Sequence, residues 1–246
     1  MNAPAQVTMI ELPYEAFGAR SALHPTLIRD DKHVILIDTG MSGKVGQLRD
    51  ALAELGVTFD MLTSIILTHQ DLDHVGGAAD ILRECSGRVT VYAHGLDKPY
   101  IEGRFPLIKT SPQALAQMAS ALPEHMRQDV MKSMEYAPIE SVDRTLDDNE
   151  RLPFCGGITV IHTPGHTAGH ISLYLEESKT LIAADALTCK DGVLHGPVRQ
   201  TTLDMETAIL SIRKLLDYEI DKVICYHGGL CSDNVQDQLK IVAEQR

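Results

Sequence analysis

The chain has 246 residues, of which 44% are hydrophobic, and this is enough apolar material to form a core without disulfides. Its formal net charge is −12, and its lysines and arginines are scattered, so we expect no nucleic acid partner, because an acidic surface repels phosphates. The five irregularly spaced cysteines include no C-x-x-C pair, which is typical of reduced thiols in a cytoplasmic protein.

The N-terminal half alternates short apolar runs with amphipathic segments. The apolar runs have the length of β-strands and lie at residues 7–12, 26–30, 33–38, 61–67 and 88–94. Residues 42–56 change to a helical period, with Val45, Leu48, Leu52 and Leu55 on one face. We expect Ser42 to cap the N-terminus of this helix and Gly56 its C-terminus. A second helix is expected to begin at Gly76.

The alternation is interrupted between about residues 95 and 138. This segment has a helical pattern and is rich in methionine, so we interpret it as a helical insertion that forms a lid. Tyr100 and the methionines at 118, 126 and 131 would suit an apolar acyl group. Alternatively, these methionines pack the core of the insertion itself.

Strands resume after the insertion, at residues 157–163, 170–176, 180–185 and 222–227. Helices are expected at residues 203–217, where the apolar residues share one face, and at 234–245. The chain thus consists of two halves, each with strands followed by strand–helix units. This order predicts a single domain, residues 1–246, with the α/β architecture of a four-layer αββα sandwich.

The sequence "ILTHQDLDHVGG" (66–77) places candidate metal ligands directly after an apolar strand. Within six positions it contains His69, Asp71, Asp73 and His74. The simpler interpretation is a polar loop whose aspartates cap the next helix. Four such side chains together fit a metal site better, because histidine and carboxylate are the ligands that such sites use.

Three later turns repeat this arrangement of an apolar strand followed by a histidine or aspartate. "HTPGHTAGH" contains His162, His166 and His170, "IAADAL" contains Asp185, and "ICYHGG" contains His227. A carboxylate at the end of an apolar strand needs a partner or a metal. A single histidine such as His227 would more often belong to the core, but the recurrence at four strand ends favours one shared site.

From about Val34 to His227 the sequence resembles the metallo-β-lactamase-fold superfamily. The resemblance lies in the order of four motifs: H-x-D-x-D-H, then T-P-G-H-T-A-G-H, then a lone aspartate and finally a lone histidine. The resemblance implies the αββα fold and two divalent metal ions per chain. It assigns His69, Asp71 and His166 to the first ion, and Asp73, His74 and His227 to the second. Asp185 would bridge the two ions, and Asp38, in the "LIDTG" turn, would orient the first loop without binding metal.

A dinuclear site of this kind predicts a metal-dependent hydrolase. Two ions hold a bridging water and lower its pKa, and the resulting hydroxide attacks an ester, lactone, thioester or similar bond. Asp73 would be catalytic, because it can bind metal and also orient the proton of the nucleophile. Asp71 stands where the common family pattern has histidine. Zinc is the metal that we expect first, and iron or manganese is the alternative, because the hard oxygen of Asp71 shifts the preference of the site towards them.

Two other functions are compatible with the pattern. A di-iron redox enzyme acting on oxygen or a persulfide would use the same scaffold. A non-catalytic metal-binding protein is disfavoured, because structural metal sites are closed.

The substrate is expected to be a small molecule. We assign Tyr100 and His195 to its pocket and leave His94 open as a pocket residue; Thr188 stands where quorum-quenching lactonases have a tyrosine. His162 and His170 are expected to be strand residues or donors behind the ligands. The remaining histidines are expected at the surface: His24, His33 and His125.

Membrane association is not expected. No signal peptide is visible, and no apolar run approaches the ~20 residues of a membrane span. A homo-oligomer is left open.

Overall fold

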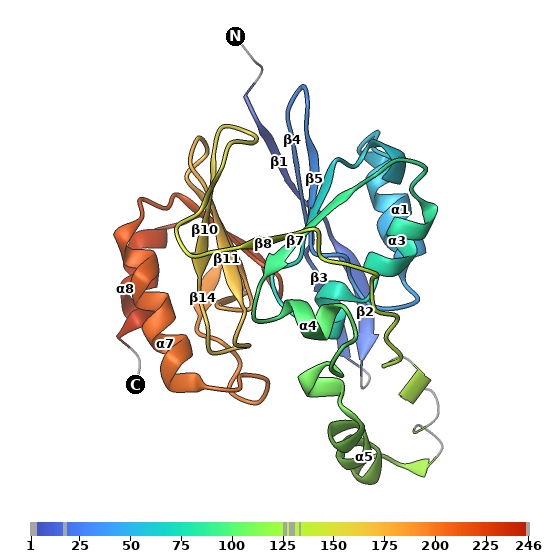
Figure 1. The fold of residues 1–246 in the computed structure, drawn as a ribbon. Coiled ribbons are helices and arrows are strands. Elements are labelled where there is room, and N and C mark those ends of the chain that lie inside the picture. The colour runs from blue at the N-terminus through green and yellow to red at the C-terminus, as the bar shows by residue number, and fades with distance from the viewer. Residues whose placement is uncertain (1–3, 17–18, 125–126, 128–130, 133, 245–246) are drawn as a thin grey trace.

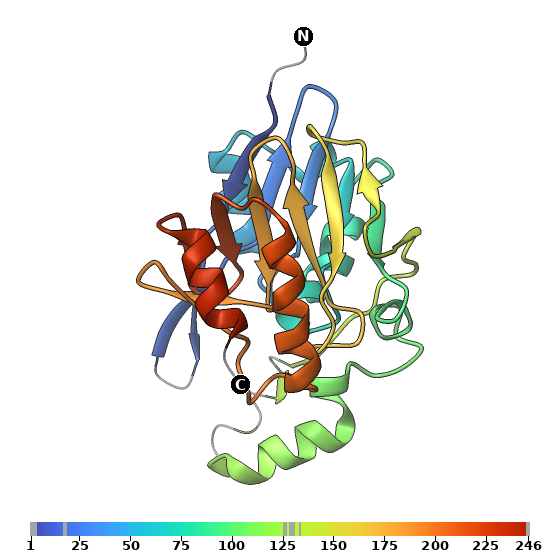
Figure 2. The same ribbon diagram turned by 90° about the vertical axis from the view of Figure 1, so that its left-hand side faces the viewer.

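Two mixed β-sheets pack face to face in the computed structural model, and helices cover both outer faces (Figure 1). The structure describes residues 4–16, 19–124, 127, 131–132 and 134–244. This is the predicted four-layer αββα sandwich. Figure 2 shows α7 (Met205–Lys214) and α8 (Val235–Ala243) lying over the strands of one sheet.

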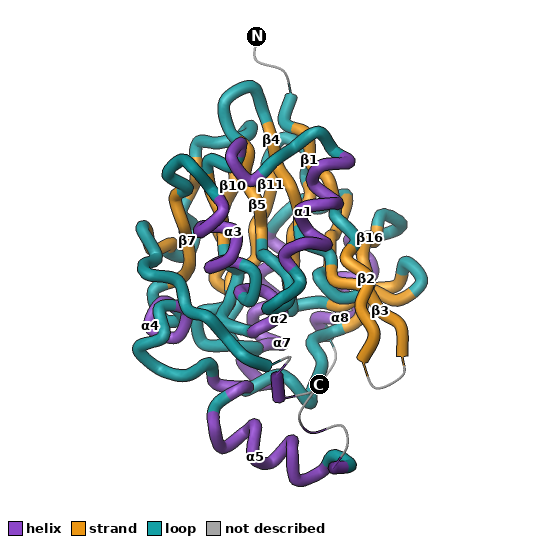
Figure 3. Tube along the Cα trace, turned by 90° about the vertical axis from the view of Figure 1, so that its right-hand side faces the viewer, coloured by secondary structure: helices purple, strands orange, loops and turns teal. Residues whose placement is uncertain are grey.

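The first sheet has the order β1-β4-β5-β6-β7-β8. Its strands are β1 (Gln6–Met9), β4 (Thr26–Arg29), β5 (Val34–Ile37), β6 (Ser64–Ile66), β7 (Thr90–His94) and β8 (Arg144–Leu146). The strands β5, β6, β7 and β8 are parallel to one another, whereas β4 is antiparallel to both β1 and β5. On the outer face lie α1 (Val45–Glu54) and α3 (Ala78–Glu84), with the 3-10 turn η1 (Phe59–Met61) between them in sequence (Figure 3).

The second sheet has the order β16-β15-β12-β11-β10-β9. Its strands are β9 (Arg151–Leu152), β10 (Ile158–His162), β11 (Ile171–Leu175), β12 (Thr180–Ala184), β15 (Lys222–Cys225) and β16 (Gly229–Cys231). Only β12 and β15 are parallel among its paired strands. The 3-10 turn η3 (Leu215–Asp217) follows α7.

The aliphatic core is divided by these layers. Alternate residues of one strand point to opposite faces, so Ile35 and Ile37 lie between the sheets, whereas Leu36 packs under the helices of the first sheet. Ile158 and Leu173 of the second sheet complete the layer between the sheets. The scarcity of aromatic residues is therefore compensated by branched aliphatic side chains packed from both sheets.

Two hairpins lie outside the main sheets. One pairs β2 (Leu12–Ala16) with β3 (Ala19–Leu23), and the other pairs β13 (Thr188–Lys190) with β14 (Val193–His195). The sequence pattern assigned residues 7–12 to one strand, which was wrong. The first strand ends at Met9, and the chain then begins the separate β2–β3 hairpin.

The insertion contains α4 (Lys98–Ile101), the 3-10 turn η2 (Ile108–Thr110) and α5 (Pro112–Ala121). The short helix α2 (Leu72–Val75) follows β6, and in Figures 1 and 3 α5 extends from the bottom of the body. No residue of α5 is buried, and Met118 is half-buried. Met126 lies outside the described residues.

The expectations for one helix cap and three histidines need correction or completion. Ser42 does not cap α1, because the helix starts later, after Lys44, and has no side-chain cap. His24 is buried, not exposed, because its Nδ1 lies 3.0 Å from the Tyr226 carbonyl oxygen at the contact between the β2–β3 hairpin and the second sheet. His33 is half-buried beside Asp30, and His125 lies outside the described residues.

All five cysteines are free thiols. No helix in the described ranges is both long and apolar enough to cross a bilayer.

Candidate metal centre

The candidate ligands meet at one edge of the sandwich because several strands end there. The loops after β5 and β6 carry Asp38 and the segment 69–74, and the loops after the parallel strands β12 and β15 carry Asp185 and His227. A backbone hydrogen bond from the Ile171 amide to the Thr68 carbonyl (3.0 Å) joins the two sheets at this edge. The topology therefore brings together residues that are far apart in sequence.

The first group comprises His69, Asp71, His166 and Asp185, which are all buried. Asp71 Oδ2 lies 2.9 Å from His166 Nε2 and 3.3 Å from His69 Nε2. Asp185 Oδ2 lies 3.2 Å from His166 Nε2. One atom from each residue is within 4.8 Å of all the others, which is the spacing of atoms that surround a single ion.

The second group comprises Asp73, His74 and His227. His227 Nε2 lies 3.2 Å from Asp73 Oδ2, and His74 Nε2 lies 3.8 Å from the same oxygen. Asp185 also reaches this group, with Oδ1 at 3.3 Å from His74 Nε2 and Oδ2 at 3.5 Å from His227 Nε2. Asp185 thus contacts both groups, and all seven residues assigned from the sequence lie together.

Buried polar atoms that lack a hydrogen-bond partner test whether these residues fit a metal ion. His69 Nε2, His74 Nε2 and Asp185 Oδ1 are buried and accept or donate no hydrogen bond. Buried polar atoms are almost always satisfied, so three orphans converging at one place indicate a missing partner. Imidazole nitrogens and a carboxylate oxygen are donors suited to a divalent ion, and the residues therefore fit one.

A further group, Asp30, His33 and Cys155, has a different character. The Asp30 carboxylate already accepts hydrogen bonds from the backbone amides of Lys32, His33 and Cys155. Its oxygens already have hydrogen-bond partners within the chain, so we interpret these three residues as a structural turn and not as a metal site.

The carboxylates and imidazoles of the centre shift one another's pKa values. Burial would raise the pKa of Asp185, but the adjacent His227 and His74 hold it well below its usual range. Burial would lower the pKa of His74, but Asp185, Asp38 and Asp73 raise it to about 10. The buried carboxylates and imidazoles therefore stabilise one another's charged forms.

Two residues behind the ligands hold them in place. Asp38 accepts hydrogen bonds from His74 Nδ1 (2.8 Å), the Thr68 amide (2.8 Å) and the Thr68 hydroxyl (2.7 Å). His170 is fully buried, and its Nε2 accepts a hydrogen bond from the Asp185 amide (3.1 Å). These contacts direct His74 Nε2 and the Asp185 side chain towards the centre.

Sequence reasoning missed Asp97, which joins the two loops that carry the first group. This fully buried carboxylate accepts hydrogen bonds from the Gln70 amide (3.0 Å), the Thr167 hydroxyl (2.7 Å) and the Gly169 amide (3.0 Å). Gln70 and Thr167 are direct neighbours of candidate ligands. The signal was present, since Asp97 follows strand β7 as the other aspartates follow theirs.

Lys109, in η2, was also missed. Its Nζ donates to Asp71 Oδ2 at 2.5 Å and lies 2.7 Å from His166 Nε2. The Ile108 amide donates to Gln70 Oε1 at 2.9 Å, so the insertion is hydrogen-bonded to the loop that carries the ligands. A single lysine within a helical segment had no sequence signal.

The residues assigned to the substrate pocket lie in different surroundings. The Tyr100 ring centroid is 5.7 Å from that of Phe105, and Tyr100 packs on the hydrophobic core of the first sheet. His195 is exposed on β14. His94 stacks on His162 with ring centroids 4.1 Å apart. The pocket roles of Tyr100 and His195 stay predictions.

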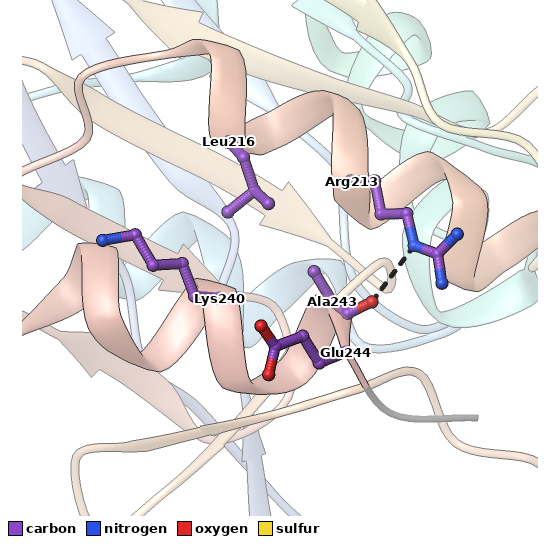
Figure 4. A pocket seen from close by; sticks show the side chains of 5 residues that line it. All are labelled: Arg213, Leu216, Lys240, Ala243 and Glu244. Atoms are coloured by element: carbon purple, nitrogen blue, oxygen red, sulfur yellow. Dashed lines mark hydrogen bonds between the residues drawn. The ribbon is translucent and has the colours of Figure 1, made fainter.

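A separate pocket of about 460 Å³ lies between α7 and α8 (Figure 4). Its lining residues are Arg213, Leu216, Lys240, Ala243 and Glu244. The Arg213 guanidinium donates from Nε to the Ala243 carbonyl at 3.2 Å, so the two helices are tied across it. None of the seven candidate ligands lines this pocket.

Comparison with known proteins identifies the family of the chain. Residues 24–227 match the family model described as the metallo-beta-lactamase superfamily. A Bacillus subtilis (strain 168) protein named "Probable metallo-hydrolase YflN" is 32% identical over 210 residues, covering 79% of this chain and 75% of the relative.

Two further similarities are weaker in sequence. An N-acyl homoserine lactonase from Bacillus sp is 25% identical over 229 residues, covering 82% of this chain and 78% of the relative. The crystal structure of the metallo-beta-lactamase family protein TTHA1429 from Thermus thermophilus superposes with a TM-score of 0.73 at 23% identity. The alignment covers 96% of this chain and 78% of that one, and it supports the fold.

Proposed function

The chain belongs to the metallo-β-lactamase superfamily and is a metal-dependent hydrolase, and on this premise we propose that it uses two divalent ions to cleave an ester, lactone, thioester or similar bond. The observation that carries the proposal is Asp185, whose two oxygens contact histidines of both groups. A carboxylate in this position can serve two ions at once.

We assign His69, Asp71 and His166 to the first ion, Asp73, His74 and His227 to the second, and Asp185 to both. When bound, the ions supply Lewis-acid polarisation and an activated water. Zinc fits the four histidines, and iron or manganese fits the additional hard oxygen of Asp71.

The protein's own residues position this chemistry. Asp73 is the catalytic residue that we propose, because its side chain is 25% exposed, more than those of Asp71 and Asp185, so that solvent reaches this carboxylate most readily. Asp38 accepts a hydrogen bond from Nδ1 of His74, and His170 accepts one from the backbone amide of Asp185. Fixed ligands keep the reacting groups oriented, which is a large part of catalysis.

The insertion, at about residues 95–138, is proposed as a lid over the centre within one domain. The hydrogen bond from Ile108 to Gln70 and the contact of Lys109 with Asp71 support this placement. A lid would exclude water and select the substrate, and its opening could limit turnover. The similarity to a lactonase favours a small lactone or ester as substrate.

The test combines metal analysis with substitution of the bridging residue. Wild type, purified without chelators, should contain two ions per chain and hydrolyse at least one member of a panel of esters, lactones and thioesters. Asp185→Asn should lose at least one ion and most activity. Asp191→Asn, at an exposed turn, is the matched control and should keep both.

Full occupancy by two ions in Asp185→Asn would refute the bridging assignment. Bound iron without hydrolysis of any panel member would instead favour the di-iron redox alternative.

A further inference from the structure

We propose that Lys109 is an internal cation that competes with the first metal ion for Asp71 and His166. The ion would enter its position only when the segment that carries Lys109 withdraws. The second group would therefore bind its ion more tightly than the first. This inference rests on the proposed two-ion site.

The competition follows from the atoms that Lys109 contacts. Its ammonium lies 2.5 Å from Asp71 Oδ2 and 2.7 Å from His166 Nε2, which are the ligand atoms of the first group. The other nitrogen of His166, Nδ1, lies 3.3 Å from the Thr202 hydroxyl. In the tautomer whose Nε2 accepts a hydrogen bond from the ammonium, the single lone pair of that nitrogen is occupied, so it cannot bind an ion at the same time.

The position of Lys109 is built into the fold. The preceding residue, Ile108, donates its amide to Gln70 Oε1, and Gln70 in turn donates from Nε2 to Asp97 at 3.2 Å. Leu107 is buried in the core of the first sheet. The Lys109 side chain is only 21% exposed, and that of Asp71 10%. An anchored, mostly buried ion pair is more persistent than a surface lysine.

The contact is specific to the first group. Within the described residues, Asp73 forms ion pairs with His74 and His227, and no lysine or arginine approaches it. Among the residues that the structure describes, the first group is therefore the one with a built-in competitor.

The pairing also gives a reason for the departure from the common motif. An aspartate at position 71 can bind an ammonium ion, whereas the histidine of the common pattern would repel it when protonated. Asp71 and Lys109 thus form a unit shared between the ligand loop and the insertion.

The experiment measures zinc binding to the metal-free full-length chain by calorimetry. Wild type should bind two zinc ions with unequal affinity. Lys109→Met keeps the length of the side chain and removes its charge. Because hydrogen bonds to charged groups are strong, we expect the weaker site to tighten by about tenfold and the tighter site to change little.

Lys132→Met is the matched control, since Lys132 is an exposed lysine of the same insertion and should leave both affinities unchanged. Thermal unfolding gives an independent readout. Metal-free Lys109→Met should melt below wild type, because the Asp71 carboxylate loses its counter-charge, and zinc should raise its Tm by more than it raises that of wild type. Lys109→Gln serves the same comparison if the methionine variant does not fold.

The outcomes separate the two proposals. If both Lys109 variants bind two zinc ions with wild-type affinities, the competition is refuted and the metal site stands. If His69→Ala also binds two ions with wild-type affinities, the ligand assignment itself is wrong.

Discussion

Replacing Asp97 with alanine would remove the carboxylate that joins the two ligand loops. Four donors would lose their acceptor: the backbone amides of Gln70 and Gly169, the side-chain amide of Gln70 and the hydroxyl of Thr167. The two side-chain donors can rotate to other partners, but the two buried backbone amides cannot. Each unsatisfied buried donor costs about 1–3 kcal/mol, so we expect the free energy of unfolding to fall by about 4 kcal/mol.

This loss should appear as a decrease in Tm. For a chain of this size, 1 kcal/mol corresponds to about 2–4 °C, so Tm should fall by about 8–16 °C. The loops that carry His69 and Asp71 on one side and His166 on the other would also lose their common anchor. Substitutions behind metal ligands typically weaken metal binding by about 10–100-fold, and we expect a change of this size at the first ion.

The assay is urea and thermal unfolding of the metal-free protein, followed by zinc titration. Asp204→Ala is the control, because Asp204 is an exposed residue that caps α7 by accepting from the Thr207 amide, and its loss should cost only about 1 kcal/mol. If Asp97→Ala were no less stable than Asp204→Ala and bound zinc as wild type does, Asp97 would not anchor the loops.

Two further predictions concern residues outside the ligand set. Burial would raise the pKa of Asp30, but hydrogen bonds from Lys32, His33 and Cys155 hold it well below its usual range. A lowered pKa means that the ionised carboxylate stabilises the fold, and this contribution is fully present above the ordinary aspartate pKa of about 3.9. The contribution is lost as the pH falls below that value, so the difference in the free energy of unfolding between wild type and Asp30→Asn should narrow below about pH 4. Urea unfolding from pH 7 to pH 3 measures this gap, and a constant gap would contradict the assignment. Gly228→Ala should destabilise by about 3 kcal/mol, because φ is +98° and a Cβ would lie 1.6 Å from the Cys189 carbonyl oxygen. Gly192→Ala, with φ +78° and no atom within 4 Å of the Cβ, should lower the free energy of unfolding by only about 1 kcal/mol. If the two glycine variants lost equal stability, backbone strain alone, and not the steric clash, would account for the loss.

Local pattern was sufficient to predict the layers and the order of the candidate ligands. A strand such as Val34–Ile37 is recognisable from its own apolar residues, and the turn that follows it carries Asp38 whatever the rest of the chain does. Parallel strands end at one edge, so histidines and aspartates placed after strands can be expected to meet. The predicted sandwich was confirmed for this reason, and the seven candidate ligands lie together.

The contacts around that centre depend on the tertiary structure. Lys109 is 38 residues from Asp71 and 57 from His166 in sequence, and nothing in its own segment indicates that it reaches either. His24 is buried where its ring contacts the carbonyl oxygen of Tyr226, which is 202 residues away. Periodicity describes which face of an element is apolar, but not which distant element packs on it. Whether a polar side chain is a surface residue, an anchor or a competitor for a ligand is decided only when the two sheets and the insertion meet.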